Sequence, residues 1–234
     1  MRGLQIIAAI ALLFSITAPT CRAADNELTA EEKAAGWQLL FNGKDNTGWK
    51  CNNDKPVASP VEDGCLVPNK SGGYLVIHEK QFGDFILKCE VKMPNPCNSG
   101  VFFRIGDPKN PVQTGFEVQV ATGKGTGSHD FGAFYDMAKL TKNNAKPAGE
   151  WNAITITARG PNLKVEVNGE TVCAMNCDEY TEAGKNPDGT KNKYKKPVKD
   201  FPRSGYIGVQ DHGTKVWYKN IKTLELNGAE KKEK

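Results

Sequence analysis

Short apolar runs separated by turn residues constrain the fold of this chain more than any other feature. From residue 37 onward these runs are bounded by Gly, Pro and Asn, and no amphipathic helix of ordinary length competes with them. Runs of this length, rich in Val, Ile, Thr and aromatic residues, are typical of β-strands. We expect strands at residues 37–41, 65–67, 74–78, 85–93, 100–104, 116–120, 133–135, 152–159, 163–167, 171–174, 206–210 and 216–226.

One hairpin is predicted with particular clarity. The run LKVEV at 163–167 is followed by Asn168-Gly169 and then by ETVCA at 170–174. Asn-Gly adopts the positive φ angles that a two-residue hairpin turn requires. Because side chains alternate along a strand, the lysine and glutamate of the first run should face water and its apolar residues the core.

The order of elements favours an all-β fold. Many short strands without βαβ alternation predict a sandwich of two antiparallel sheets. The chain is long enough for one such domain, which we place at 36–227, after a polar lead-in at 24–35 and before a charged tail at 228–234.

The first residues predict export. Arg2 precedes an apolar run at 4–16, and small residues end at Ala23, which is the pattern of a cleaved secretory signal peptide at 1–23. We therefore expect a secreted or periplasmic protein with no membrane attachment after cleavage; a lipid-modified Cys21 is the alternative. The net charge of +4 includes Arg2 and Arg22, so the mature chain is nearly balanced and no nucleic-acid partner is indicated.

Six of the seven cysteines lie beyond the signal peptide, and an even number in an oxidising compartment favours disulfides. The local candidate pairs are Cys51 with Cys65 and Cys173 with Cys177; Cys89 and Cys97 complete the set. Buried free thiols are the alternative reading. No Cys-x-x-Cys pair indicates a metal site.

Polar side chains recur at every second position in three predicted strands. In FEVQV at 116–120, Glu117 and Gln119 point away from the apolar side chains, and in YIGVQDH at 206–212 Tyr206, Gln210 and His212 do the same. Arg104 shares its parity with Phe102. Carboxylates, amides and a guanidinium beside aromatic rings suit a sugar, since they bond its hydroxyls while the rings cover its apolar faces. The alternative is that these are ordinary solvent-facing strand residues.

Three stretches are too polar or Gly-rich for strands, namely 42–64, 122–130 and 181–203. Long loops in compact domains are often functional. The third is strongly basic, and we read it as a solvated surface excursion, with a docking patch for an anionic polymer as the alternative.

The motifs taken together resemble the 3-keto-disaccharide hydrolase family. They are LFNGK at 40–44 with Trp49, NSGVFFR at 98–104, GFEVQ at 115–119, EWN at 150–152, VNG at 167–169 and GVQDHG at 208–213, in order from about residue 36 to 226. The resemblance implies a concanavalin-A-like jelly-roll sandwich. It also implies cleavage of glycosides that carry a ketone at C3, through 3-keto-glucoside 1,2-lyase and 3-keto-2-hydroxyglucal hydratase activities.

Such a ketone acidifies the hydrogen on C2, so that one base can remove it and the C1 substituent can leave. We expect His212 to act as general base or acid at C2 and Glu117 to transfer the reciprocal proton toward the leaving oxygen, although the roles could be exchanged. Gln119, Gln210 and Arg104 would orient hydroxyls and stabilise the enolate.

Lys219 stands where such proteins often have an arginine, and it keeps the charge but not the bidentate fork. No cofactor is expected, with a divalent metal on Glu117 and His212 as a weaker alternative. Two other functions stay open: a lectin-like carbohydrate-binding module and an envelope structural protein.

Overall fold

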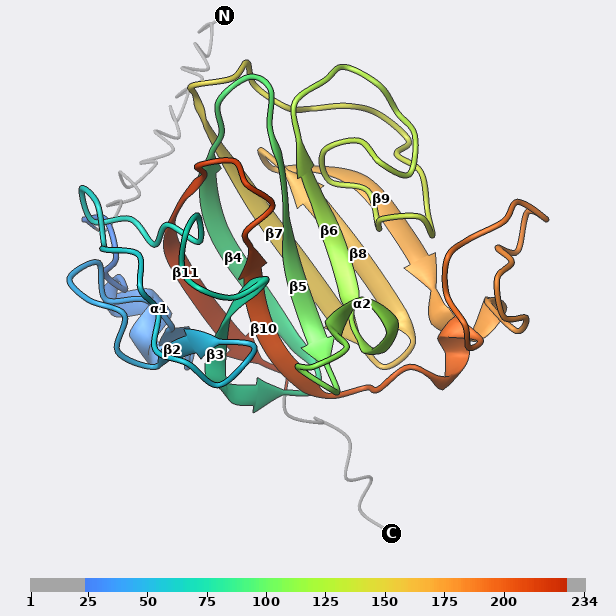
Figure 1. Cartoon of the computed structure of the whole chain (residues 1–234), viewed down its shortest axis with the longest axis horizontal. Helices are drawn as coiled ribbons and strands as arrows, with labels where there is room; N and C mark the ends of the chain where they lie inside the picture. Colours follow the sequence, from blue (N-terminus) through green and yellow to red (C-terminus); the bar gives the residue numbers. More distant parts are fainter. Residues whose placement is uncertain (1–23, 227–234) are drawn as a thin grey trace, which may run out of the picture.

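The computed structural model describes residues 24–226, and within them two antiparallel sheets lie face to face (Figure 1). The six-stranded sheet has the order β1 (Gln38–Leu39), β11 (Trp217–Glu225), β4 (Phe85–Lys92), β7 (Trp151–Arg159), β8 (Asn162–Val167) and β9 (Glu170–Asn176). The five-stranded sheet has the order β2 (Trp49–Cys51), β3 (Leu75–Phe82), β10 (Gly205–Gln210), β5 (Asn98–Ile105) and β6 (Phe116–Ala121). The predicted all-β, concanavalin-A-like jelly-roll sandwich is confirmed. The expected signal peptide at 1–23 and tail at 228–234 lie outside the described residues.

Alternate residues of each strand fill the space between the sheets. On β5 and β6 the inward side chains include Val101, Phe103, Phe116 and Val118, all at most 1% exposed. The rings of Phe103 and Phe116 stack at 5.3 Å between centroids. Since successive strand residues point to opposite faces, this packing leaves the intervening residues on the outer face of the sheet.

The predicted hairpin joins β8 to β9. Asn168 and Gly169 form its turn with φ angles of 51° and 83°. The Asn168 side chain further ties the turn to the neighbouring strand, because its Oδ1 accepts the Ala153 amide at 2.9 Å.

Three local predictions were wrong. The stretch 42–64, expected to be only loop, contains β2, which pairs with β3 and whose Trp49 indole donates to the Leu40 carbonyl at 2.7 Å. The strands expected at 65–67 and 133–135 form only isolated bridges. Such short segments are decided by the partner strand that tertiary packing offers and not by their own composition.

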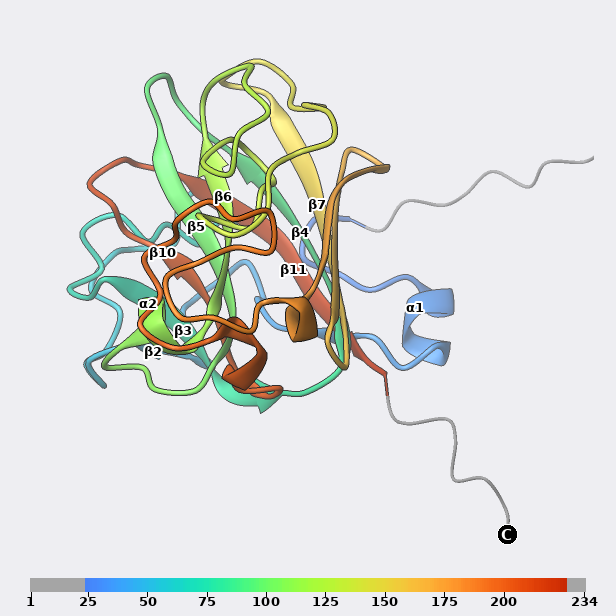
Figure 2. The same cartoon turned by 90° about the vertical axis from the view of Figure 1, so that its right-hand side faces the viewer.

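The helices are short: α1 (Ala30–Ala34), α2 (Pro111–Thr114) and the 3₁₀ turns η1 (Cys177–Glu179) and η2 (Val198–Asp200). Figure 2 shows α1 on the six-stranded side of the sandwich, and α2 on the side of β5 and β10. No helix among residues 24–226 has the length and hydropathy needed to cross a membrane.

The disulfide prediction was wrong for the described chain. All six cysteines of residues 24–226 are free and buried. Several thiols instead point at backbone carbonyls, as Cys51 does at Ser71 (3.2 Å) and Cys173 at Ala138 (3.5 Å). These residues behave as small apolar core residues.

Candidate functional site

The outer face of the five-stranded sheet carries the predicted polar residues. Glu117 on β6 pairs with Phe102 on β5, which pairs with Gly208 on β10. Two residues further along the same face of β6, Gln119 pairs with Gly100. Gln210 lies two residues after Gly208 on β10. The structure therefore brings Glu117, Gln119 and Gln210 onto one face, as their parity predicted.

Glu117 lies over Gly100. A methyl group built on Gly100 would come within 2.5 Å of Glu117 Oε1, so the glycine leaves the space that the carboxyl occupies. The side chain is only 5% exposed, and it makes no hydrogen bond with the described residues. Burial raises the pKa of Glu117 to about 7, against the opposing charge of Lys193. A carboxyl with this pKa can gain or lose a proton at neutral pH.

Two glutamine side chains on the same face each have one amide atom without a hydrogen-bond partner among the described residues. Gln119 Nε2 donates to Asn98 Oδ1 at 3.0 Å, and Gln210 Nε2 donates to the Tyr74 hydroxyl at 2.5 Å. The Oε1 atoms of both glutamines are buried and have no partner among the described residues. Buried acceptors without a donor are rare in folded proteins, and a hydroxyl-bearing ligand or water would satisfy them.

His212 lies on the same side of the sheet, just beyond the end of β10. Its imidazole is exposed, and its Nδ1 lies 3.4 Å from Asn98 Nδ2. Since Asn98 also accepts from Gln119, it links His212 to the Gln119 amide. An open pocket of about 520 Å³ adjoins His212, lined by Asn69, Lys70, Tyr74, Asp211, His212 and Gly213.

Aromatic side chains border this surface. Phe102 is buried, and Tyr74, which is 37% exposed, meets it edge-on at 6.2 Å between centroids. Tyr206 shares the face but is half-buried in an apolar cluster with Ile105 and Phe102. Tyr74, which was not predicted, is thus the aromatic ring presented to solvent next to the glutamines.

The placement predicted for Arg104 was wrong. Phe103 and Arg104 on β5 stand opposite the single residue Ile207 on β10, so a bulge breaks the alternation after Phe102. Arg104 has a φ of 49° and is fully buried. Its guanidinium donates to the carbonyls of Gly83 (3.0 Å) and Gly160 (2.8 Å) and to Asp84 (2.7 Å), all outside the polar face. Arg104 is a structural residue here.

Lys219 also lies elsewhere, which corrects its predicted place in the site. It belongs to β11, in the six-stranded sheet, across the sandwich from Glu117. Its ammonium pairs with Asp25 at 2.6 Å and lies 4.3 Å from the centre of the Trp151 ring. No sugar held at Glu117 could touch it.

Three further residues near this site, Tyr135, Lys193 and Asn98, were missed. The Tyr135 amide donates to the Glu117 carbonyl at 2.9 Å, and the Lys193 ammonium lies 3.9 Å from the centre of the Tyr135 ring. Asn98 could have been found, because it has the same parity as Gly100. Nothing in the sequence distinguishes Lys193 from the other basic residues of 181–203.

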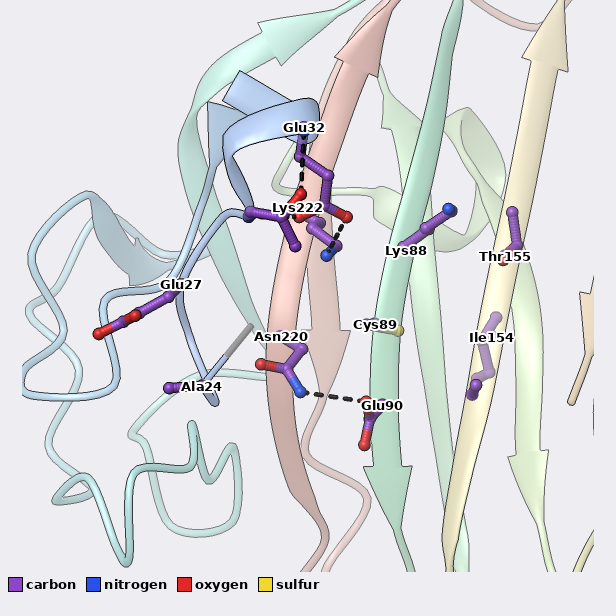
Figure 3. Close-up of a pocket in the computed structure, with 12 residues that line it drawn as sticks. Ala24, Glu27, Glu32, Lys88, Cys89, Glu90, Ile154, Thr155, Asn220 and Lys222 are labelled. Atoms are coloured by element: carbon purple, nitrogen blue, oxygen red, sulfur yellow. Dashed lines mark hydrogen bonds and ion pairs between the residues drawn. The ribbon is translucent and has the colours of Figure 1, made fainter. Parts of the chain in front are cut away.

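A second pocket, of about 240 Å³, opens on the other side of the sandwich between α1 and strands β11, β4 and β7 (Figure 3). Its polar groups bond one another: Lys222 pairs with Glu32, and Asn220 Nδ2 donates to Glu90 at 3.1 Å. None of its side chains is among the buried unpartnered polar groups of residues 24–226. Glu117 and its neighbours are therefore the better candidate for a functional site.

The described residues form no metal-binding site. Within residues 24–226 no three His, Cys, Asp or Glu side chains are grouped as a metal ion would require. Glu117 and His212, the ligands of the alternative metal site, belong to no such group among residues 24–226.

The fold and the site define a jelly-roll protein with a buried carboxyl and sugar-compatible amides on one sheet face. The domain model described as 3-keto-alpha-glucoside-1,2-lyase-like matches residues 36–223, and the chain belongs to that family. The 3-keto-disaccharide hydrolase of Bacteroides thetaiotaomicron is 26% identical, with 83% of this chain and 80% of that protein aligned.

Two crystal structures of proposed glycosyl hydrolases from Parabacteroides distasonis have a similar fold. One has a TM-score of 0.72 at 29% identity and covers 87% of this chain and 100% of its own. The other has a TM-score of 0.68 at 27% identity and covers 81% of this chain and 99% of its own.

Proposed function

We propose that this protein is an exported enzyme that cleaves 3-keto-glucosides, including 3-keto-disaccharides, by elimination and rehydration. The observation that carries the proposal is the buried Glu117 carboxyl, which has no hydrogen-bond partner in the described chain and a pKa raised to about 7. Family membership supports the substrate class.

Glu117 is the better candidate for the base at C2. Ordinary glycosidases flank the bond with two carboxylates, and this face offers one. A ketone at C3 makes one sufficient, because the C2 hydrogen becomes acidic. Glu117 has the pKa that a general base needs at neutral pH.

The remaining residues bind the sugar and protonate the leaving oxygen. The free Oε1 atoms of Gln119 and Gln210 accept hydrogen bonds from sugar hydroxyls. Exposed Tyr74 covers an apolar sugar face, and the aglycone extends toward the pocket at His212. His212, which is linked to the Gln119 amide through Asn98, protonates the leaving oxygen.

The reaction balances without an oxidant or reductant. Glu117 takes the C2 proton, and the electron pair forms an enolate whose charge lies on the oxygen at C3. The enolate expels the C1 oxygen, which leaves as an alcohol after protonation, and a C1=C2 double bond remains. Water then adds its hydroxyl to C1 while Glu117 returns a proton to C2, giving 3-keto-glucose.

Incubation with 3-keto-trehalose in D₂O tests the proposal. We expect free 3-keto-glucose carrying deuterium at C2, detected by NMR and mass spectrometry, whereas unoxidised trehalose stays intact. Glu117→Gln should lower turnover by about 100-fold or more, the usual contribution of a general base. Cleavage without deuterium at C2, or full turnover by Glu117→Gln, would contradict the mechanism. Sugar binding without product would indicate a lectin-like module instead.

A further inference from the structure

The basic excursion at 181–203 is attached at Lys193 to α2 and to the loop after β6. The Lys193 amide donates to Asp136 Oδ2 at 2.7 Å, and its carbonyl accepts from Gln113 Nε2 at 3.1 Å. Gln113 belongs to α2, and Asp136 follows Tyr135 in the loop after β6. Main-chain bonds to two separate elements fix where this residue lies.

The neighbours of Lys193 reinforce that position. The Tyr194 hydroxyl donates to the Tyr135 carbonyl at 2.7 Å, and the Lys195 amide donates to Gln113 Oε1 at 2.9 Å. Tyr194 is buried, whereas Lys193 and Lys195 are both exposed. These bonds order the excursion at this point, while most of residues 181–203 are exposed, as the composition predicts.

The Lys193 side chain lies over the Tyr135 ring, and its charge interacts with that of Glu117. Its ammonium lies 3.9 Å from the centre of the Tyr135 ring, and the Tyr135 amide is bonded to the Glu117 carbonyl. A cation over an aromatic face is held by the negative charge of the ring. Lys193 forms no ion pair within 4.0 Å in the described chain, so its ammonium can bind a ligand.

Lys193 is the charged residue that interacts electrostatically with Glu117. Apart from it, the titratable groups that interact with Glu117 are Tyr74, Tyr135, Tyr194 and Tyr218, all neutral at physiological pH. Asp136 interacts with Lys193 and itself contacts His129. Partial desolvation lowers the pKa of Lys193, and the charges of Glu117 and Asp136 oppose that change. Lys193 is thus the cation that counterbalances the buried carboxylate.

We propose that Lys193 is a catalytic residue whose ammonium stabilises the negative charge that moves from Glu117 to the C3 oxygen of the sugar. Before the reaction, the ammonium balances the Glu117 carboxylate. When Glu117 takes the C2 proton it becomes neutral, and the ammonium then attracts the enolate oxygen. A fixed cation that faces the developing charge accelerates such a step. This inference rests on the proposed function and adds a residue to it.

The test compares Lys193→Met and Lys193→Arg with Lys195→Met. Both positions lie in the same basic segment, but Lys195 has no side-chain contact with Tyr135 or Glu117 among the described interactions. The anchoring bonds of residue 193 are made by its main chain, so the substitutions should preserve the fold, and circular dichroism with thermal unfolding checks this.

We expect Lys193→Met to lower kcat/KM for 3-keto-trehalose by about 100-fold, as for the loss of one oxyanion-stabilising group. Lys193→Arg should restore part of that loss, and Lys195→Met should behave as the wild type. The rising limb of the pH–rate profile should also move to higher pH in Lys193→Met, because Lys193 holds the Glu117 pKa down. If Lys193 made only a structural contact, the rising limb of the Lys193→Met variant would lie at the same pH as that of the wild type.

The Glu117 carboxyl band in infrared difference spectra, wild type minus Glu117→Gln, measures the same pKa without substrate. An unchanged rate and limb in Lys193→Met, with Glu117→Gln inactive, would overturn this inference and leave the proposed function standing. A fully active Glu117→Gln would overturn the proposed function itself.

Discussion

At the scale of single residues, the site depends on a carboxyl that is costly to keep in place. Glu117 is desolvated and lacks a hydrogen-bond donor in the described chain, so its ionised form is unfavourable in the folded protein. Residues tuned for proton transfer commonly weaken the fold that holds them.

Stability should therefore depend on pH through Glu117. Its pKa is 4.5 in the unfolded chain and about 7 in the folded one. Below pH 4.5 Glu117 is protonated in both states. Between pH 4.5 and about 7 it ionises first in the unfolded state, and the free energy of unfolding falls by up to about 3 kcal/mol. Glu117→Gln should therefore be more stable than the wild type above pH 7 and equal to it below pH 4.5. Urea unfolding from pH 4 to 8 checks this, and equal stability at pH 8 would contradict it.

Gly100 should be intolerant of a side chain. Its φ is not positive, so the requirement is for space: a β-carbon there would lie 2.5 Å from Glu117 Oε1. We expect Gly100→Ala to displace the carboxyl and lower kcat by about 10-fold or more, as small misplacements of catalytic groups do. Gly83→Ala is the matched control, because its nearest contact would be 4.0 Å away. Equal activity of both variants would argue against the geometry.

At the scale of elements, a bulge decides what β5 presents to each face. The extra residue opposite Ile207 moves Arg104 off the polar face, where it forms three hydrogen bonds, to Gly83, Asp84 and Gly160. The same alternation, uninterrupted on β6, leaves Glu117 and Gln119 on the outer face.

Arg104→Met should cost about 3 kcal/mol or more of unfolding free energy, since it leaves a partly buried carboxylate and two carbonyls without their donor. Lys142→Met breaks the exposed pair with Glu170 and should cost less than about 1 kcal/mol. Chemical denaturation measures both. A small loss of unfolding free energy for Arg104→Met, together with reduced sugar binding, would instead indicate that Arg104 is a substrate-binding residue.

At the scale of the whole molecule, stability comes from one extensive apolar core between the sheets, within which the free cysteines are packed. Burial raises the pKa of Cys89 and Cys97 to about 12, so their thiols stay protonated and unreactive.

A thiol titration tests this arrangement. Protein lacking residues 1–23 should show no rapid reaction of its six cysteines with Ellman's reagent when native and six equivalents when unfolded. Dithiothreitol should not change its melting temperature. Fewer than six thiols in the unfolded, unreduced protein would reveal a disulfide.

The sequence by itself determined the fold class and most of the strands, because alternation of apolar and polar residues and the Asn168-Gly169 turn are local signals. It also determined that Glu117, Gln119 and Gln210 share one face, since parity holds along an unbroken strand. Only the tertiary structure decided the rest. The bulge removed Arg104, sheet assignment placed Lys219 across the sandwich, and long-range bonds selected Lys193 from a basic segment. Each of these depends on contacts between residues distant in the chain, which local periodicity does not encode.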